Sequence, residues 1–500
     1  TSPTDDNLLQ EGRAVPSTRV GRAIGFASLG VSLAAGAVAE VASRTIGTST
    51  VTSYENAHTG ETTRISPLAS YANADRLATS LCRMRGAAMK LGQMLSIQDE
   101  TILPPTLSRA LDKVRQGAEA MPSRQLYQQL ESQLGVDWRD KLISFEERPF
   151  AAASIGQVHR AYIPDNNSSG GRKVVMKVQY PGVSDSIDSD LNNLSMLVKM
   201  SGFAPPGLFI ENVIRVGRDE LKVECDYIRE VANQKRFKQL VENDVDLSRN
   251  DFCVPGVIEE LTTSQILTTE YAPGGTIDKV SNLEQDERNR IGRNILRLTM
   301  RELFTWRFMQ TDPNWGNFLY DVNTRTTSLI DFGAARDYDA KFVDGYLNIV
   351  WANANRNEEL LMEESKRMGF LTGEENDIMM EAHKMSGYTL GEPFASDEPF
   401  DFRGSLITKR LSEHGAPFLQ HRLTPPPEEV YTLHRKLAGA YNLCIKLGAV
   451  VRCRDLLEEV MENHVFDSHT TDSSKESQST ETSNAAEGNS AGNTQASLNF

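Results

Sequence analysis

The chain has 500 residues, 39% hydrophobic and 24% charged, so it can form a sizeable core and is long enough for two or three structural units. Its net charge of −15 argues against nucleic acid as a main partner, because phosphate binding depends on clustered Lys and Arg. Five cysteines without a CxxC pair or a nearby His cluster argue against a disulfide framework or a zinc site, and favour a reducing compartment.

The N-terminal part contains one long apolar segment. Residues 1–19 are polar and expected to be disordered; they start at Thr1 rather than at Met, which leaves room for an upstream targeting segment. Arg22 and Glu40 then bracket 17 uncharged residues, and a helix of that length spans about 25 Å, just short of a bilayer core. We predict that residues 20–44 are a membrane anchor that spans the bilayer or lies on it, with a buried soluble helix as the alternative.

Small residues are frequent in this apolar segment. Gly21 and Gly25 have the GxxxG spacing that lets membrane helices pack closely, which indicates a dimer through this helix. Residues 45–70 follow; they are rich in Thr and Ser and are predicted to be a linker.

Residues 71–145 are predicted to be mainly helical. Apolar residues recur at intervals of four and three, which keeps one apolar face on a helix: Leu77, Leu81, Met84, Ala88, Leu91 and Leu95. A second stripe on a later helix comprises Leu126, Leu130 and Leu134.

From about residue 146 the pattern becomes that of strands. Residues 151–158 read as strand–loop–strand, and 173–179 and 266–272 as further strands, with one long helix over 210–242 between them. The chain is then mostly helical to residue 466. Residues 467–500 contain almost no large apolar side chains and are predicted to be a disordered tail.

The strongest chemical signal is a set of three polar residues. Asp312 and Asn317 have the spacing of the catalytic loop of protein kinases, and Asp331 opens an Asp-Phe-Gly triplet after room for two strands. A Mg²⁺ ion on nucleotide phosphates needs hard oxygen ligands, which the Asn317 amide and the Asp331 carboxylate would supply. Asp312 would then orient an attacking hydroxyl or water.

The upstream half of the chain contains a matching lysine. Lys177 interrupts an apolar strand and resembles the kinase lysine that holds the α- and β-phosphates. Such a lysine needs a carboxylate on a following helix, and Glu224 and Glu230 are the candidates. Six residues apart, they would lie on different faces of one helix, so only one can pair with Lys177. Residues 266–272 are interpreted as the hinge strand that meets adenine.

Three features depart from ordinary protein kinases. Ala151-Ala152-Ala153 replaces the Gly-rich phosphate loop, where glycine normally lets backbone N–H groups approach phosphate. No Ala-Pro-Glu motif or peptide-binding segment follows Asp331. Asn314 stands where Ser/Thr kinases have Lys, which removes a positive charge near the γ-phosphate and disfavours fast phosphoryl transfer.

Together, four sequence features resemble the UbiB family of atypical kinase-like proteins, especially its mitochondrial members needed for coenzyme Q biosynthesis. They are Lys-Leu-Gly-Gln at 90–93, Ala-Ala-Ala-Ser-Ile-Gly-Gln-Val-His at 151–159, Glu-Cys-Asp at 224–226 and the loop at 312–317. The resemblance spans residues 70–465. It implies an α+β, protein-kinase-like fold with two lobes: a helical insertion (71–145) over the cleft, an N-lobe (146–275) and a mostly helical C-lobe (276–466).

The resemblance also implies roles for single residues. Lys90 and Gln93 would belong to the insertion that covers the peptide site, and Glu224 and Asp226 would contact it, which leaves Glu230 as the partner of Lys177. Ala153 would set the preference between ATP and ADP, and Asp312, Asn317 and Asp331 would carry ATP and Mg²⁺.

The expected function is that of an ATPase supporting coenzyme Q biosynthesis on the matrix side of the mitochondrial inner membrane, without protein kinase activity in trans. Its expected partners are inner-membrane lipids and other coenzyme Q biosynthesis proteins. A kinase of a lipid or phenolic intermediate and a nucleotide-binding scaffold are the alternatives. The phosphate acceptor separates the first two, and an intact set of Lys177, Asp312, Asn317 and Asp331 argues against the scaffold.

Overall fold

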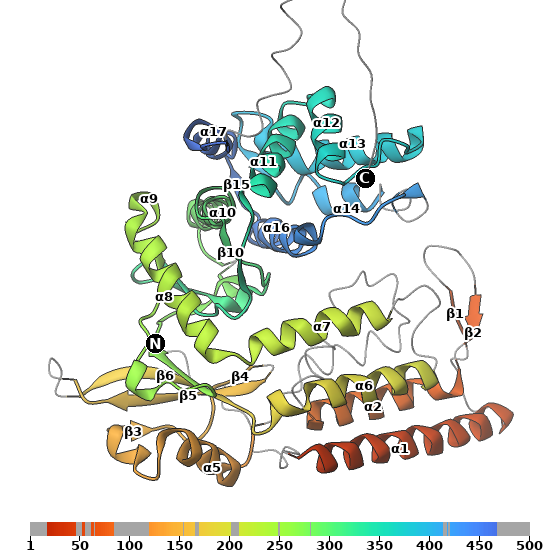
Figure 1. Ribbon diagram of the computed structural model, residues 1–500, viewed down its shortest axis with the longest axis vertical. Coiled ribbons are helices and arrows are strands. Elements are labelled where there is room, and N and C mark those ends of the chain that lie inside the picture. Colours follow the sequence, from red (N-terminus) through yellow and green to blue (C-terminus); the bar gives the residue numbers. More distant parts are fainter. Residues whose placement is uncertain are drawn as a thin grey trace, which may run out of the picture.

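The computed structural model describes residues 18–46, 53–55, 62–64, 66–84, 120–153, 155–165, 170–201, 210–248, 251–280, 282–413, 418 and 421–467. Lys90 and Gln93 lie outside these residues, as do residues 1–17 and 468–500 of the ends predicted to be disordered at 1–19 and 467–500; Arg19 begins helix α1. Buried apolar side chains of the described part form two clusters, one from Phe26 to Leu267 and one from Phe237 to Val460. The molecule accordingly has two lobes, with helix α8 (Tyr227–Asn243) between them (Figure 1).

The first lobe is built on an antiparallel sheet. Its strands follow the order β3-β5-β6-β8, with β4 paired to β5. Their bounds are β3 Ser144–Phe145, β4 Ala151–Ala152, β5 Gly156–Ile163, β6 Arg172–Gln179 and β8 Ile266–Glu270. Alternate residues of β6 are buried, as expected for a strand with one face on the core: Val174, Met176 and Val178. Helix α5 (Ser123–Leu134) packs with its leucine stripe against this core.

The predicted single helix over residues 210–242 is wrong. The structure has two helices, α7 (Ile210–Glu224) and α8, which are separated at Cys225 and Asp226. The Asp226 carboxylate accepts a hydrogen bond from the Arg229 backbone N–H, so this residue caps the start of α8 instead of continuing α7. Below them run α6 (Val183–Ser201) and the N-terminal helices (Figure 1).

Helix α1 (Arg19–Ile46) packs lengthwise on α2 (Tyr71–Met84) and α6 (Figure 1). Within the described residues it is the one helix long and apolar enough to cross a membrane. One face is buried in the protein through Phe26, Leu29 and Leu33. At Gly36 the two helices approach so closely that a Cβ would lie 1.9 Å from Asn73 Oδ1, which explains a glycine there.

The same helix carries a buried charge. The Arg22 Nε donates to Asp190 Oδ2 of α6 over 2.6 Å, and both side chains are almost fully buried. The contact joins two residues far apart in the sequence and holds α1 against the first lobe. A short hairpin of β1 (Ser53–Glu55) and β2 (Thr62–Arg64) lies between α1 and α2 in the chain.

The second lobe is mostly helical. Its helices are α10 Gln285–Met300, α11 Ala340–Ala354, α12 Glu358–Arg367, α13 Asp377–Gly391, α14 Ile407–Glu413, α16 Glu428–Leu447 and α17 Arg454–Asn463. This lobe also contains a four-stranded sheet of order β7-β12-β11-β9, with β7 Phe252–Cys253, β9 Gly275–Thr276, β11 Phe318–Asp321 and β12 Thr326–Leu329. Smaller pairs join β10 (Phe308–Gln310) to β13 (Ala335–Asp337), and β14 (Phe400–Asp401) to β15 (Val450–Val451). A short helix α9 (Val245–Ser248) follows α8.

Candidate functional site

Lys177 joins the two lobes through charge. Its strand β6 places the ammonium 3.0 Å from Oε1 and 3.1 Å from Oε2 of Glu230 on α8. The same Nζ lies 3.4 Å from Asp331 Oδ2, at the end of β12 in the second lobe. Glu230 is almost fully buried, whereas 34% of the Asp331 side chain is exposed. One lysine thus contacts a structural carboxylate and an accessible one.

Burial and charge oppose each other in this triad. Burial alone would lower the pKa of Lys177, but the carboxylates of Asp331 and Glu230 raise it well above its usual value, so the lysine stays cationic. Burial raises the pKa of Glu230 to about 7, although the neighbouring ammonium opposes the change. The triad therefore holds more carboxylate than one ammonium can balance.

The two acidic residues expected to contact the insertion lie at the α7–α8 junction. Glu224 ends α7, close enough to Lys177 for its charge to help raise the pKa of the lysine. Asp226 caps α8 through the Arg229 N–H at 3.0 Å. Lys90 and Gln93 lie outside the described residues, so their contact with these carboxylates stays a prediction.

The loop after β10 brings Asp312 and Asn317 together. Asn317 Nδ2 donates to Asp312 Oδ2 over 2.8 Å, and the backbone N–H of Asn314 donates to Asp312 Oδ1 over 3.2 Å. Gln310 ties this loop to the next: its Oε1 accepts from the Asp312 N–H, and its Nε2 donates to the Asp331 carbonyl over 2.8 Å. The antiparallel pair β11–β12 separates Asn317 from Asp331 along the chain and returns them to the same end of the sheet.

Helix α8 holds the Asp-Phe-Gly segment from the other side. Arg229 donates to the carbonyls of Gly333 (3.0 Å) and Ala335 (2.6 Å), and Asn233 donates to that of Phe332 (3.0 Å). These side chains are one turn apart on α8, next to Glu230. Sequence reasoning missed Arg229, Asn233 and Gln310; the signal that could have found the first two is their helical spacing around Glu230.

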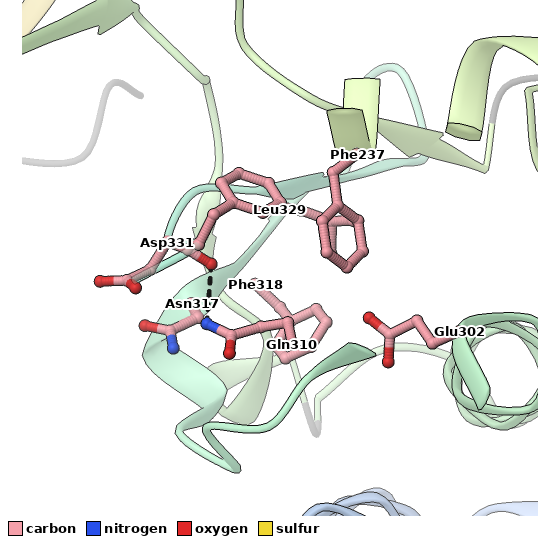
Figure 2. Close-up of a pocket in the computed structure, with 8 residues that line it drawn as sticks. Phe237, Glu302, Gln310, Asn317, Phe318, Leu329 and Asp331 are labelled. Carbon is pink, nitrogen blue, oxygen red and sulfur yellow. Dashed lines mark hydrogen bonds between the residues drawn. The ribbon is translucent and has the colours of Figure 1, made fainter. Parts of the chain in front are cut away.

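Asp331 and Asn317 have the chemistry of a magnesium site completed by a ligand. Figure 2 shows the Asp331 carboxylate and the Asn317 amide on the same side of a cavity of about 10 Å³, with Glu302 at the opposite side. Because the Asn317 amide nitrogen is bonded to Asp312, its oxygen is left for a metal. Within the described chain no group of three or more His, Cys, Asp or Glu forms a metal site, so phosphate oxygens and water would complete the coordination.

The alanine-rich segment forms a tight turn beside Lys177. Ala151 and Ala152 form β4, and the Ala153 N–H donates to the Gly156 carbonyl over 2.8 Å. A Cβ at Gly156 would lie 2.5 Å from the Val178 carbonyl oxygen, so this position needs glycine for close strand contact. Val158, which follows in β5, is paired with Lys177 in β6.

A buried polar network begins at Gln157, which is paired with Ala152 of this turn. Gln157 Oε1 accepts from the Met121 N–H over 2.8 Å, and Gln157 Nε2 lies 2.8 Å from His159 Nε2. His159 Nδ1 lies 2.9 Å from the Glu146 carbonyl oxygen, and burial lowers the pKa of this imidazole to about 4. The network connects the alanine-rich segment to the chain that enters α5, a connection that the sequence motif alone did not indicate.

The segment after the Asp-Phe-Gly triplet is short. Gly333 is followed by the three residues of β13, and α11 begins at Ala340 with Asp339 as its cap. Ordinary protein kinases use a long segment here to hold substrate peptide. The absence of such a segment, predicted from the missing Ala-Pro-Glu, holds for this fully described stretch of the chain.

Comparison with known proteins agrees with this geometry. The ABC1 atypical kinase-like domain family matches residues 113–365. The chain is 44% identical to "Atypical kinase coq-8, mitochondrial" of Caenorhabditis elegans, over 91% of this chain and 58% of that relative. It is 45% identical to "Atypical kinase COQ8B, mitochondrial" of Danio rerio (90% and 69% covered) and 44% identical to its counterpart in Rattus norvegicus (90% and 82%). The chain thus spans less than two thirds of the nematode relative.

A solved structure shares the fold. The complex of Rv3197 with erythromycin from Mycobacterium tuberculosis superposes with a TM-score of 0.55 at 25% identity, covering 78% of this chain and 96% of that one. Together with the family match, this likeness confirms the predicted α+β, kinase-like fold.

Proposed function

Because this chain belongs to the ABC1 atypical kinase-like family, we propose that it binds Mg-ATP between Lys177 and Asp331 and hydrolyses it in support of coenzyme Q biosynthesis. The observation that carries the proposal is the position of the Lys177 ammonium, 3.0 Å from Glu230 and 3.4 Å from Asp331. A lysine held in this way is oriented for phosphate, and an accessible carboxylate beside it can bind the metal.

Each residue of the site would have a distinct task. Lys177 would hold the α- and β-phosphates, while Glu230 keeps its side chain extended. Asp331 and Asn317 would bind Mg²⁺, which offsets phosphate charge when bound. Asp312, held by Asn317 and by the Asn314 N–H, would orient the attacking water. The backbone of β8, the edge strand beside β6, would meet adenine.

Three observations favour hydrolysis over phosphorylation of proteins in trans. The segment between Gly333 and α11 is too short to present a peptide in the manner of protein kinases. The turn at Ala153 has methyl groups where a phosphate loop has glycine, so it would favour one nucleotide over the other. Asn314 supplies no positive charge near the γ-phosphate.

The insertion that contains Lys90 and Gln93 would add a further block to protein substrates by contacting Glu224 and Asp226. In this proposal Lys90→Ala alters ATP hydrolysis or self-phosphorylation but retains nucleotide binding, whereas Lys177→Ala loses binding. Equal loss of nucleotide binding in the two variants would make Lys90 a direct nucleotide ligand and contradict the gating role.

The mitochondrial names of the relatives support a mitochondrial location. Within the mitochondrion, the proposed place is the matrix side of the inner membrane, among other coenzyme Q biosynthesis proteins. Helix α1 would contact lipid through the face that is not packed on α2 and α6. Gly21 and Gly25 on this helix would serve a dimer.

The decisive experiment is product analysis with γ-labelled ATP, Mg²⁺, liposomes and a phenolic quinone precursor. The proposal expects label in free phosphate, lost in Asp312→Asn and Asp331→Asn. Label in an organic product would instead establish a small-molecule kinase. Nucleotide binding without turnover under all of these conditions would favour a scaffold.

A further inference from the structure

A second cavity, of about 540 Å³, is lined mainly by residues of α11, α13, α14 and α16. These helices lie together in the helical lobe (Figure 1). This volume is within the range of roughly 300–1,000 Å³ that small-molecule sites occupy. Its walls are mainly apolar, including Leu303, Ile349, Phe370, Leu390, Leu411 and Leu437. Tyr431, which also lines it, is 58% exposed, so the cavity is accessible from solvent.

The cavity is separate from the nucleotide site. Helix α16 lines it with residues at helical spacing: Val430, His434, Leu437 and Tyr441. Other positions of α16 contact the Asp312 loop instead. The carbonyl of Gly439 accepts a hydrogen bond from Trp315 Nε1 over 3.1 Å, and Lys436 pairs with buried Glu302 at 3.2 Å.

The cavity is lined by neutral polar groups, such as Asn353, Ser386 and Thr408, and by one arginine and two histidines. Arg422 lines it, with its Nε buried and without a hydrogen-bond partner, and its charge lowers the pKa of His383 and His434 in the same walls. Burial is the larger cause of both shifts, which bring these two pKa values to about 4 and leave the rings neutral near pH 7.

No carboxylate balances this arginine. Among the residues that the structure describes, no ion pair involves Arg422, and burial lowers the pKa of its guanidinium. The carboxylate of Glu375 raises the pKa of His383, but it already accepts hydrogen bonds from the backbone N–H groups of Thr372 and Gly373. A half-buried guanidinium whose buried Nε has no hydrogen-bond partner is stabilised when a ligand supplies a carboxylate.

We propose that this cavity binds an apolar molecule with a single carboxylate, whose head group pairs with Arg422 while its body occupies the apolar walls. The planar guanidinium matches a carboxylate geometrically, and the neutral imidazoles of His383 and His434 add no competing charge. The site does not depend on the nucleotide function proposed above.

Isothermal titration of the full chain tests the proposal with two acids below their aggregation concentrations. Dodecanoate represents a fatty acid and 4-butylbenzoate an aromatic acid, so their relative affinities identify the source of the carboxylate. The uncharged controls are 1-dodecanol and 4-butylbenzamide. We expect at least one acid to bind with a 1:1 stoichiometry and at least tenfold more tightly than its control.

Two variants locate the binding. Arg422→Gln removes the charge and should weaken binding by about tenfold to a hundredfold, the size of a charge-assisted hydrogen bond. Ala438→Phe places a larger side chain in the cavity from α16 and should also weaken binding. It provides a second test of the site if Arg422→Gln folds poorly. Arg452→Gln, the same change at an exposed position, should bind like wild type, and so should Asp331→Asn.

Two results would overturn the proposal: no binding of either acid to wild type, or binding that Arg422→Gln and Ala438→Phe leave unchanged. Equal affinity for the acids and their uncharged controls would exclude the carboxylate as the recognised group.

Discussion

At the residue scale, charge around Lys177 determines what the site can accept. Three carboxylates, those of Asp331, Glu230 and Glu224, act on one ammonium. Arg229, the cation next to Glu230 on α8, already donates hydrogen bonds to two backbone carbonyls. The excess negative charge is tolerated partly because burial raises the pKa of Glu230 to about 7. A divalent cation at Asp331 would relieve it more completely.

Asp331→Asn should abolish Mg-dependent stabilisation by nucleotide, because an amide cannot replace the carboxylate as a charged metal ligand. For wild type, Mg-ATP at 100 times its dissociation constant should add about 2.7 kcal/mol of stability. Thermal shifts with and without Mg²⁺ measure the difference. Asp337→Asn, an exposed aspartate on β13, is the matched control. A wild-type shift in Asp331→Asn would show that the metal is held elsewhere.

His159 should make the first lobe sensitive to acid. Its pKa is about 4 in the folded protein and 6.5 in the unfolded chain, so below pH 6.5 the unfolded state binds a proton that the folded state does not. Stability from this group is complete above pH 6.5 and is lost as the pH falls towards 4, by about 2 kcal/mol at pH 5.

Urea denaturation at pH 7 and pH 5 checks this expectation. His159→Gln should reduce the loss of stability between these pH values, whereas His421→Gln, at a half-buried position of the other lobe, should not. An unchanged pH dependence in His159→Gln would assign the acid sensitivity to other groups.

At the element scale, helix α8 does most to arrange the site. Helix α8 contributes Tyr227 to the first core and Phe237 to the second, and between them Glu230 and Arg229 contact Lys177 and the Asp-Phe-Gly segment. The aromatic ring of Phe237 packs against those of Phe308 and Phe332, each with centroids 5.0 Å apart. A shift of α8 would therefore move the partner of Lys177 and the Asp-Phe-Gly segment that contains Asp331 together.

Helix α1 is held by its buried ion pair, and breaking this pair should be costly. Arg22→Ala leaves Asp190 buried with its charge uncompensated, and we expect a loss of about 3–5 kcal/mol in unfolding free energy. Arg22→Met combined with Asp190→Leu should recover most of it. Arg44→Ala, which breaks a pair with Glu40 inside the same helix, should cost about 0.3–0.5 kcal/mol. Similar losses for Arg22→Ala and Arg44→Ala would contradict the buried role of the first pair.

At the scale of the whole molecule, the N-terminal helices and the first lobe share one continuous core. Phe26 and Leu33 of α1 belong to the same cluster as Val174 and Leu267 of the sheet lobe. Removing residues 1–70 would thus uncover apolar surface as well as delete a membrane anchor. Substitution on the outer face of α1 separates these two effects better than truncation does.

That outer face should mediate membrane binding. Ile24, Val31 and Val38 recur every seven residues and are 64%, 72% and 72% exposed. Changing all three to Asp should prevent co-sedimentation with anionic liposomes, because charged side chains do not enter the apolar part of a bilayer. Val136→Asp, at an exposed position elsewhere, is the control. Equal sedimentation of the triple variant and wild type would place the lipid contact on another surface.

The sequence by itself determined which polar side chains make up the candidate site. Asp312, Asn317 and Asp331 are separated by loops and one hairpin, so local spacing was enough to bring them together. Lys177 was identified because a lysine in an apolar strand breaks a local pattern. The fold class followed from the order of these motifs and is confirmed by the relatives.

Only the tertiary structure decided how distant groups pair. The break at Asp226 depends on a capping hydrogen bond, and it is this break that places Glu230, rather than Glu224, against Lys177. The partner of Arg22 lies 168 residues away, and the cavity at Arg422 is assembled from residues of α10, α11, α12, α13, α14 and α16. Sequence periodicity indicates which face of a helix or strand is buried. Which neighbouring element that face contacts depends on long-range packing, and this packing determines the surroundings of the charged side chains of Arg22, Glu230 and Arg422.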